Sequence, residues 1–110
     1  MEPENSEENR ETTMALNRKL SSLVQKRELA KSEATPGQLS LSFTDGSQLL
    51  IRLASAAPPM PGTGTMEKVL ETGSRLVLVL EPESRIELAL ADPGASISLR
   101  DAQGTIEYLG

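Results

Sequence analysis

The chain has 110 residues, a net charge of −5 and 2% aromatic residues, with no cysteine and no histidine. The two absences exclude disulfides, a thiolate nucleophile, Cys- or His-based metal sites and the commonest general base. The scarcity of aromatic side chains argues against a surface on which the bases of single-stranded nucleic acid could stack. No catalytic, metal-binding or cofactor-binding motif is recognisable, so we expect a protein that is not an enzyme and that needs no cofactor.

The N-terminal residues 1–12 contain five Glu, one Arg and no aliphatic residue beyond Met1. This composition predicts a disordered, acidic N-terminus. The segment lacks the apolar region of a signal peptide, and no apolar run approaches the ~18 residues of a membrane-spanning helix. We therefore expect a cytoplasmic protein without a membrane segment.

An amphipathic, charged helix is expected over 13–36. The stretch 13–32 contains no Gly or Pro, and Pro36 and Gly37 would end the helix. Four apolar residues fall on one helical face: Leu16, Leu20, Leu23 and Val24.

The same segment is basic, whereas the rest of the chain is acidic. A basic helix face could touch RNA, acidic protein or anionic lipid, although a solvated face is the more common use of such charges. Binding to nucleic acid is not expected, because the acidic remainder repels phosphate. The basic residues are Arg18, Lys19, Lys26, Arg27 and Lys31.

From Gln38 onward apolar residues alternate with polar ones, which predicts β-hairpins. The hairpin 39–54 recurs without gaps at 76–91, 37 positions later, and a third hairpin covers 96–109. A shared buried face favours three-residue loops at 45–47 and 82–84. These loops would place Phe43 opposite Leu49, Leu80 opposite Ile86 and Glu81 opposite Arg85. In the third hairpin a four-residue loop would place Leu99 opposite Ile106 and Ile97 opposite Tyr108.

Two segments allow alternatives. The Pro- and Gly-rich stretch 55–64 is either a recognition loop or a plain connector between the repeats. The stretch 65–73 is a strand or a short helix, and we favour the strand. The expected strands lie near 38–44, 48–54, 65–71, 75–81, 85–91, 95–100 and 104–109.

The sequence thus predicts a mainly β chain, α+β overall. We expect a small antiparallel barrel or sandwich of about six to seven strands with an internally duplicated hairpin. The β domain would cover 37–110, preceded by the one N-terminal helix.

The functional expectation comes from the stretch 76–80, which is apolar on both faces. Such strands are usually covered on both sides. Either the helix packs on Val77 and Val79, or a second copy or another protein does. The expected interface comprises Leu16, Leu20, Leu23, Val77 and Val79.

We therefore expect a non-catalytic interaction or assembly module, most simply a homo-oligomer. The alternatives are a β-barrel that binds a small ligand, an RNA-binding accessory that uses the basic helix and, last, a hydrolase that uses carboxylates alone.

Overall fold

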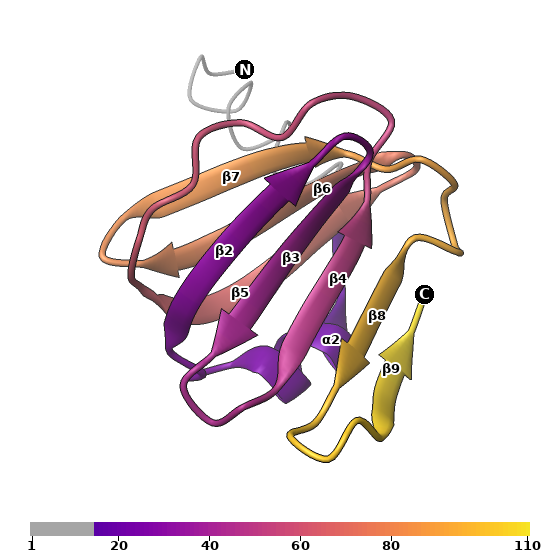
Figure 1. Cartoon of the computed structure of the whole chain (residues 1–110). Helices are drawn as coiled ribbons and strands as arrows, with labels where there is room; N and C mark the ends of the chain where they lie inside the picture. Colours follow the sequence, from indigo (N-terminus) through magenta and orange to yellow (C-terminus); the bar gives the residue numbers. More distant parts are fainter. Residues whose placement is uncertain (1–14) are drawn as a thin grey trace, which may run out of the picture.

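Two facing antiparallel sheets make up the chain in the computed structural model, which describes residues 15–110 (Figure 1). The four-stranded sheet has the order β1-β5-β6-β7, and the five-stranded sheet has the order β2-β3-β4-β8-β9. The expected mainly β class is confirmed as a sandwich-like fold, not a closed barrel. The disorder expected for 1–12 lies outside the described residues.

The elements have the following bounds: β1 Ala15–Leu16, α2 Arg18–Val24, β2 Leu29–Thr35, β3 Gln38–Phe43, β4 Gln48–Arg52, β5 Thr65–Thr72, β6 Arg75–Glu81, β7 Ser84–Ala89, β8 Ile97–Arg100 and β9 Ile106–Leu109.

The expected long helix is wrong in the described part of its range. Helix α2 has seven residues, capped by the Asn17 side chain, and Lys26 with φ 71° lies just beyond its end. The next residues form β2, which pairs with β3. The residues of β2 are good helix formers, but they form a strand because pairing satisfies the backbone hydrogen-bonding groups at the edge of β3. The pairing also buries Leu29 opposite Phe43. Tertiary pairing therefore overrides helix propensity.

The repeat is longer than the hairpin seen in the sequence. We name 18–54 repeat 1 and 55–91 repeat 2. Every residue pair between β2 and β3, and between β3 and β4, recurs 37 positions later between β5 and β6 and between β6 and β7. Even the irregularity between Leu29 and Lys31 recurs, between Met66 and Lys68. The strand expected at 65–71 is confirmed as β5.

The two repeats contact each other in the pattern of an approximate two-fold axis. Backbone bridges join Glu28 to Thr65 and Leu53 to Leu90, and the members of each bridge are 37 positions apart. At the first bridge, Leu29 N–H donates to Gly64 O (2.7 Å) and Met66 N–H donates to Arg27 O (2.9 Å). The two donors are 37 positions apart, as are the two acceptors, so exchange of the repeats converts one bond into the other. The bridges join the two sheets at the ends of their strands.

Helix α2 and the stretch 55–64 hold equivalent places at the start of each repeat. Figure 1 shows α2 below the sandwich and the loop arching over its top. Leu20 and Leu23 of the helix correspond to Ala57 and Met60 of the loop, and all four pack against the core. The stretch 55–64 is therefore more than a plain connector, because it covers one end of the sandwich as α2 covers the other.

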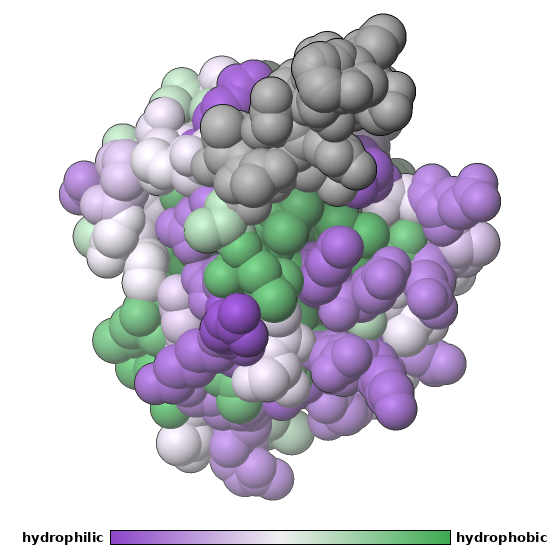
Figure 2. Space-filling view, turned by 180° about the vertical axis from the view of Figure 1, so that it is seen from behind, coloured by the Kyte–Doolittle hydropathy of each residue, from purple (hydrophilic) through white to green (hydrophobic). Residues whose placement is uncertain are grey.

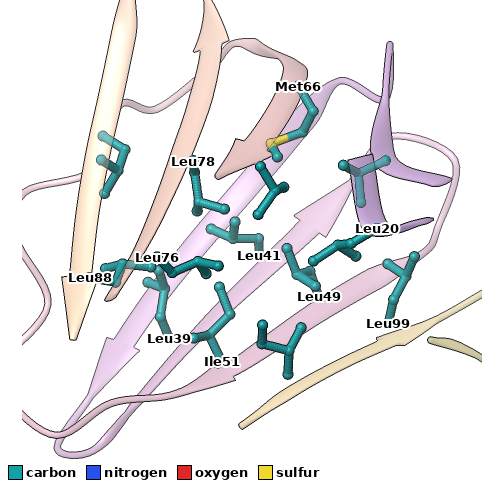
Figure 3. Close-up of a cluster of buried hydrophobic side chains, with 14 of the residues drawn as sticks. Leu20, Leu39, Leu41, Leu49, Ile51, Met66, Leu76, Leu78, Leu88 and Leu99 are labelled. Carbon is teal, nitrogen blue, oxygen red and sulfur yellow. The ribbon is translucent and has the colours of Figure 1, made fainter. Parts of the chain in front are cut away.

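Aliphatic side chains fill the space between the sheets (Figure 3). Leu39, Leu41 and Ile51 of repeat 1 and Leu76 and Leu78 of repeat 2 are fully buried there. Burial of this aliphatic surface is the main stabilising contribution to the fold.

The expected three-residue loops are present, but one position earlier than predicted. In the first hairpin, Gly46 has φ 90° and its N–H donates to Phe43 O (3.0 Å). A three-residue hairpin loop ends on a left-handed residue, so Gly46 closes a loop of 44–46. Leu41, not Phe43, therefore faces Leu49.

The second hairpin is displaced in the same way. Glu83 corresponds to Gly46 and also has positive φ, at 44°. Leu78 faces Ile86, and Arg85 faces Val79. The predicted pairs of Leu80 with Ile86 and of Glu81 with Arg85 are therefore wrong.

The register of the third hairpin also differs from the prediction. Leu99 faces Tyr108 and Arg100 faces Ile106, because a bulge inserts Glu107 between these pairs. Ile106, which we expected opposite Leu99, is consequently 46% exposed.

Alanine at Gly46 is expected to lower the free energy of unfolding by about 1–2 kcal/mol from the left-handed backbone alone. A Cβ atom there would also lie 2.9 Å from the Cβ of Ala102, which adds to the loss. Glu83→Gly, at the equivalent position, should change the stability by less than about 1 kcal/mol, because relief of strain offsets the added chain entropy. Urea denaturation measures both, and a Gly46→Ala protein as stable as the wild type would contradict the assigned turn.

Candidate functional site

Three of the five expected interface residues lie on the outer face of the four-stranded sheet. Leu16 faces Leu70 across β1 and β5, and Leu70 faces Val77 across β5 and β6. Directly opposed residues project from the same face of a sheet. Leu70, Val77 and Val79 form an apolar cluster separate from the core, which we call the outer cluster.

The other two expected residues lie elsewhere. Leu20 is fully buried in the main core, and Leu23 packs against that core. The hypothesis that the helix covers Val77 and Val79 is therefore wrong. Helix α2 instead closes one end of the sandwich, where Ser21 Oγ accepts a hydrogen bond from Val69 N–H at 2.8 Å.

The outer faces of the two sheets differ at equivalent positions. The outer cluster corresponds, 37 positions earlier, to Glu33, Ser40 and Ser42 in the five-stranded sheet. These three are exposed or half-buried. Because the strand register is the same in both repeats, backbone geometry does not account for the difference. The apolar character is a property of this one outer face.

The outer cluster is enclosed by charged and apolar neighbours. Val79 lies between Lys68 and Arg85, and Val77 lies beside Glu87. Val77 is 4% exposed, whereas Leu16 at the margin is 43% exposed. Figure 2 shows this side of the molecule, where an apolar patch lies beside hydrophilic residues. Most of the apolar surface that a partner could contact on this face therefore belongs to Leu16, at the margin of the outer cluster.

A polar network that sequence reasoning missed lies around α2. Asn17 Nδ2 donates to Glu71 Oε1 (2.8 Å) and to the Tyr108 hydroxyl (2.9 Å), while its Oδ1 caps the helix. These groups come from three distant parts of the chain. The only local signal was the preference of Asn for the N-cap position. The network joins β9 to the four-stranded sheet.

Arg27 links the same region to the first turn. Its Nη2 donates to Glu107 Oε1 at 2.9 Å, and its Nε lies 3.7 Å from Asp45 Oδ2. Its Nη1 is buried and has no hydrogen-bond partner within residues 15–110. Arg27, Asp45 and Glu107 thus join three distant segments of the same chain. We call this structural cluster the clamp.

Asp45 is held in its ionised form within this clamp. Hydrogen bonds from the hydroxyl and the backbone N–H of Ser47 lower the pKa of Asp45 below its ordinary value, and Arg27 acts in the same direction. A lowered pKa in the folded state stabilises the fold above the unfolded-state pKa, and that contribution is lost as the pH falls through the folded-state pKa. The clamp is therefore intact at neutral pH.

The basic residues do not form the single helical face that was expected. Arg18 and Lys19 lie on α2, and Lys26 lies beyond its end. Arg27 is half-buried in the clamp, and Lys31 lies on β2 with its Nζ 3.3 Å from Glu33 Oε2. This dispersal removes the geometric basis of the RNA-binding alternative.

An open groove of about 570 Å³ lies at the turn between β6 and β7. Its charged lining residues are Glu67, Glu81, Glu83 and Arg85. Within residues 15–110, no group of three or more acidic side chains has the arrangement to hold a metal ion. The described residues also contain no helix that is both long and apolar enough to span a membrane.

Comparison with known proteins gives no guide to the function. No family model, no curated protein and no solved structure matches the chain.

Proposed function

We propose that this protein is a non-catalytic assembly module that self-associates through the four-stranded sheet. The observation that carries the proposal is the difference between the two outer faces. Two sheets with the same strand register carry an apolar cluster on one outer face and Glu and Ser on the other. The cluster itself is buried in the single chain, and the exposed Leu16 beside it extends the same face as apolar surface that a second copy can cover.

The contact surface in this proposal is centred on Leu16 and the adjoining outer cluster. Leu16 contributes the exposed apolar area, and Lys68, Arg85 and Glu87 surround the cluster. An apolar centre with a charged rim is the usual composition of a protein–protein contact. Two copies would pack with these faces together.

Leu16→Glu is expected to weaken face-to-face association at least roughly tenfold, because it places a charge in an apolar contact. Leu16 is exposed in the single chain, so the variant should remain folded. Light scattering after size exclusion, over a range of concentrations, measures the association.

Ile106→Glu is the matched control. Ile106 is exposed to a similar extent (46%) but belongs to the five-stranded sheet. It should leave association unchanged. If Leu16→Glu has no more effect than Ile106→Glu, the outer face is not the contact.

A further inference from the structure

The open groove at the turn between β6 and β7 is formed by one end of the four-stranded sheet. Its volume, about 570 Å³, is in the range of protein sites that bind a ligand. The apolar part of its lining comes from Val79, Leu80 and Pro82. Val79 and Leu80 are buried, so they lie at the base of the groove, whereas Pro82 in the turn is exposed.

The charged part of the lining is predominantly acidic. Glu67, Glu81 and Glu83 are exposed, and within residues 15–110 none of the three forms a salt bridge. Arg85, the one cation of the lining, already has an interaction. Three carboxylates against one guanidinium leave the groove with a net negative charge, which favours a cationic occupant.

The equivalent turn of repeat 1 already holds a guanidinium group. Arg27 Nε lies 3.7 Å from Asp45 Oδ2 in the turn 44–46, and the Arg27 side chain is only 17% exposed. Gly46 of the same turn lies against Ala102 of the β8–β9 turn. The β6–β7 turn lies at the left of Figure 1, away from β8 and β9. The turn of repeat 1 is therefore covered by the chain itself in a way that the turn of repeat 2 is not.

Repeat 2 has no side chain at the position that corresponds to Arg27. That position is Gly64, 37 residues later. Its φ is 150°, and a Cβ atom there would lie 3.1 Å from Leu80 Cδ2 and 3.3 Å from Glu81 O. An arginine at this position would crowd the strand end. A guanidinium at the turn of repeat 2 therefore has to come from outside the repeat.

We propose that this groove binds an arginine side chain of a partner protein. The apolar stem of the arginine lies along Val79, Leu80 and Pro82, and its guanidinium group meets the carboxylates of Glu81 and Glu83. Arginine side chains commonly bury the stem while the charged group stays at the surface. A guanidinium group also binds carboxylates through two parallel hydrogen bonds, which favours arginine over lysine.

The shape of the groove favours an arginine carried on a peptide over a free small cation. The lining spans three adjacent strands, with Glu67 on β5, Val79 on β6 and Arg85 on β7. Neighbouring strands are about 4.8 Å apart, so the groove extends about 10 Å across the sheet. Three residues of extended peptide span about the same length. A small cation would cover only part of this lining.

The arginine site can be tested separately from the proposed face contact. Glu81 and Glu83 do not belong to the charged residues that surround the outer cluster, and Leu16 does not line the groove. Loss of arginine binding would therefore leave the self-association proposal intact. Leu16→Glu should weaken self-association and leave arginine binding unchanged.

Nuclear magnetic resonance titration of the isotope-labelled full chain tests the site. The probe is the peptide acetyl-Gly-Ala-Arg-Ala-Gly-amide, whose only charge is the arginine. We expect saturable shift changes at Glu67 and at residues 79–85. Glu81→Gln/Glu83→Gln should weaken binding roughly tenfold or more, because it removes two charged acceptors. Both residues are exposed, and circular dichroism checks that the variant is folded.

Glu33→Gln/Asp92→Asn is the matched control. It changes the net charge by the same amount at two exposed residues outside the groove, so it should bind the peptide as the wild type does. The same peptide with citrulline, the neutral analogue of arginine, should not bind. Equal binding of the two peptides, or shift changes outside the groove alone, would overturn the proposal.

Two further measurements test the identity of the occupant. Propylguanidinium, which is the arginine side chain alone, should bind more weakly than the peptide. If it binds as tightly, the occupant is a small cation and the assignment to a protein segment is wrong. Light scattering should give the same mass for Glu81→Gln/Glu83→Gln as for the wild type. A lower mass would mean that a second copy supplies the arginine, which contradicts a separate partner.

Discussion

Leu78→Ala is expected to lower the free energy of unfolding by about 2–5 kcal/mol. Leu78 is fully buried between the sheets and faces Val69 on β5 and Ile86 on β7. Truncation removes three carbon atoms from a close-packed interior and leaves a cavity between these neighbours. Equilibrium denaturation in urea measures the loss.

The two repeats provide the control for this result. Leu41 occupies the equivalent place on β3 and is also fully buried, so Leu41→Ala should cost a similar amount. Leu109 is 67% exposed, and Leu109→Ala should change the stability by less than about 0.5 kcal/mol. A loss at Leu78 no greater than that at Leu109 would contradict the observed core.

Leu20→Ala should also cost about 2–5 kcal/mol, because Leu20 is fully buried in the same core. A helix that lay on the surface as a separate arm would tolerate the change. Leu16→Ala alters a side chain that is 43% exposed and should have a much smaller effect. Thermal and urea unfolding distinguish the two.

The same argument applies to removal of the segment 1–36. The deletion takes away β1, α2, β2 and Pro36, and it exposes the edge of β3 together with Leu39 and Leu41. We expect the remainder, 37–110, to be unfolded or aggregated. A well-folded monomer of 37–110 would show that the N-terminal elements are dispensable.

Local pattern predicted the central hairpins and β5, because alternating apolar residues identify a strand wherever one face is buried. The sequence also revealed part of the repeat. It did not reveal β2, because Leu29–Thr35 contains good helix formers and no alternating stripe. Extending the 37-residue offset backward from the strand expected at 65–71 would have predicted it.

The candidate site was also predicted only in part from the sequence. The apolar stretch 76–80 correctly indicated an unusual outer face at Val77 and Val79. It could not show that Leu16 borders this face while Leu20 enters the core. That outcome depends on the pairing of β1 with β5, a contact between residues more than 50 positions apart.

The sequence by itself determined the mainly β class, the hairpins and their repetition, because side-chain alternation and turn residues act within a few positions of each other. Tertiary structure alone decided the hairpin registers, the position of α2 and the two-fold relation of the repeats. Left-handed turn residues fixed the registers, and burial of Leu20 and Leu29 outweighed helix propensity. These outcomes depend on the free energy of contacts between distant segments, which no local pattern records.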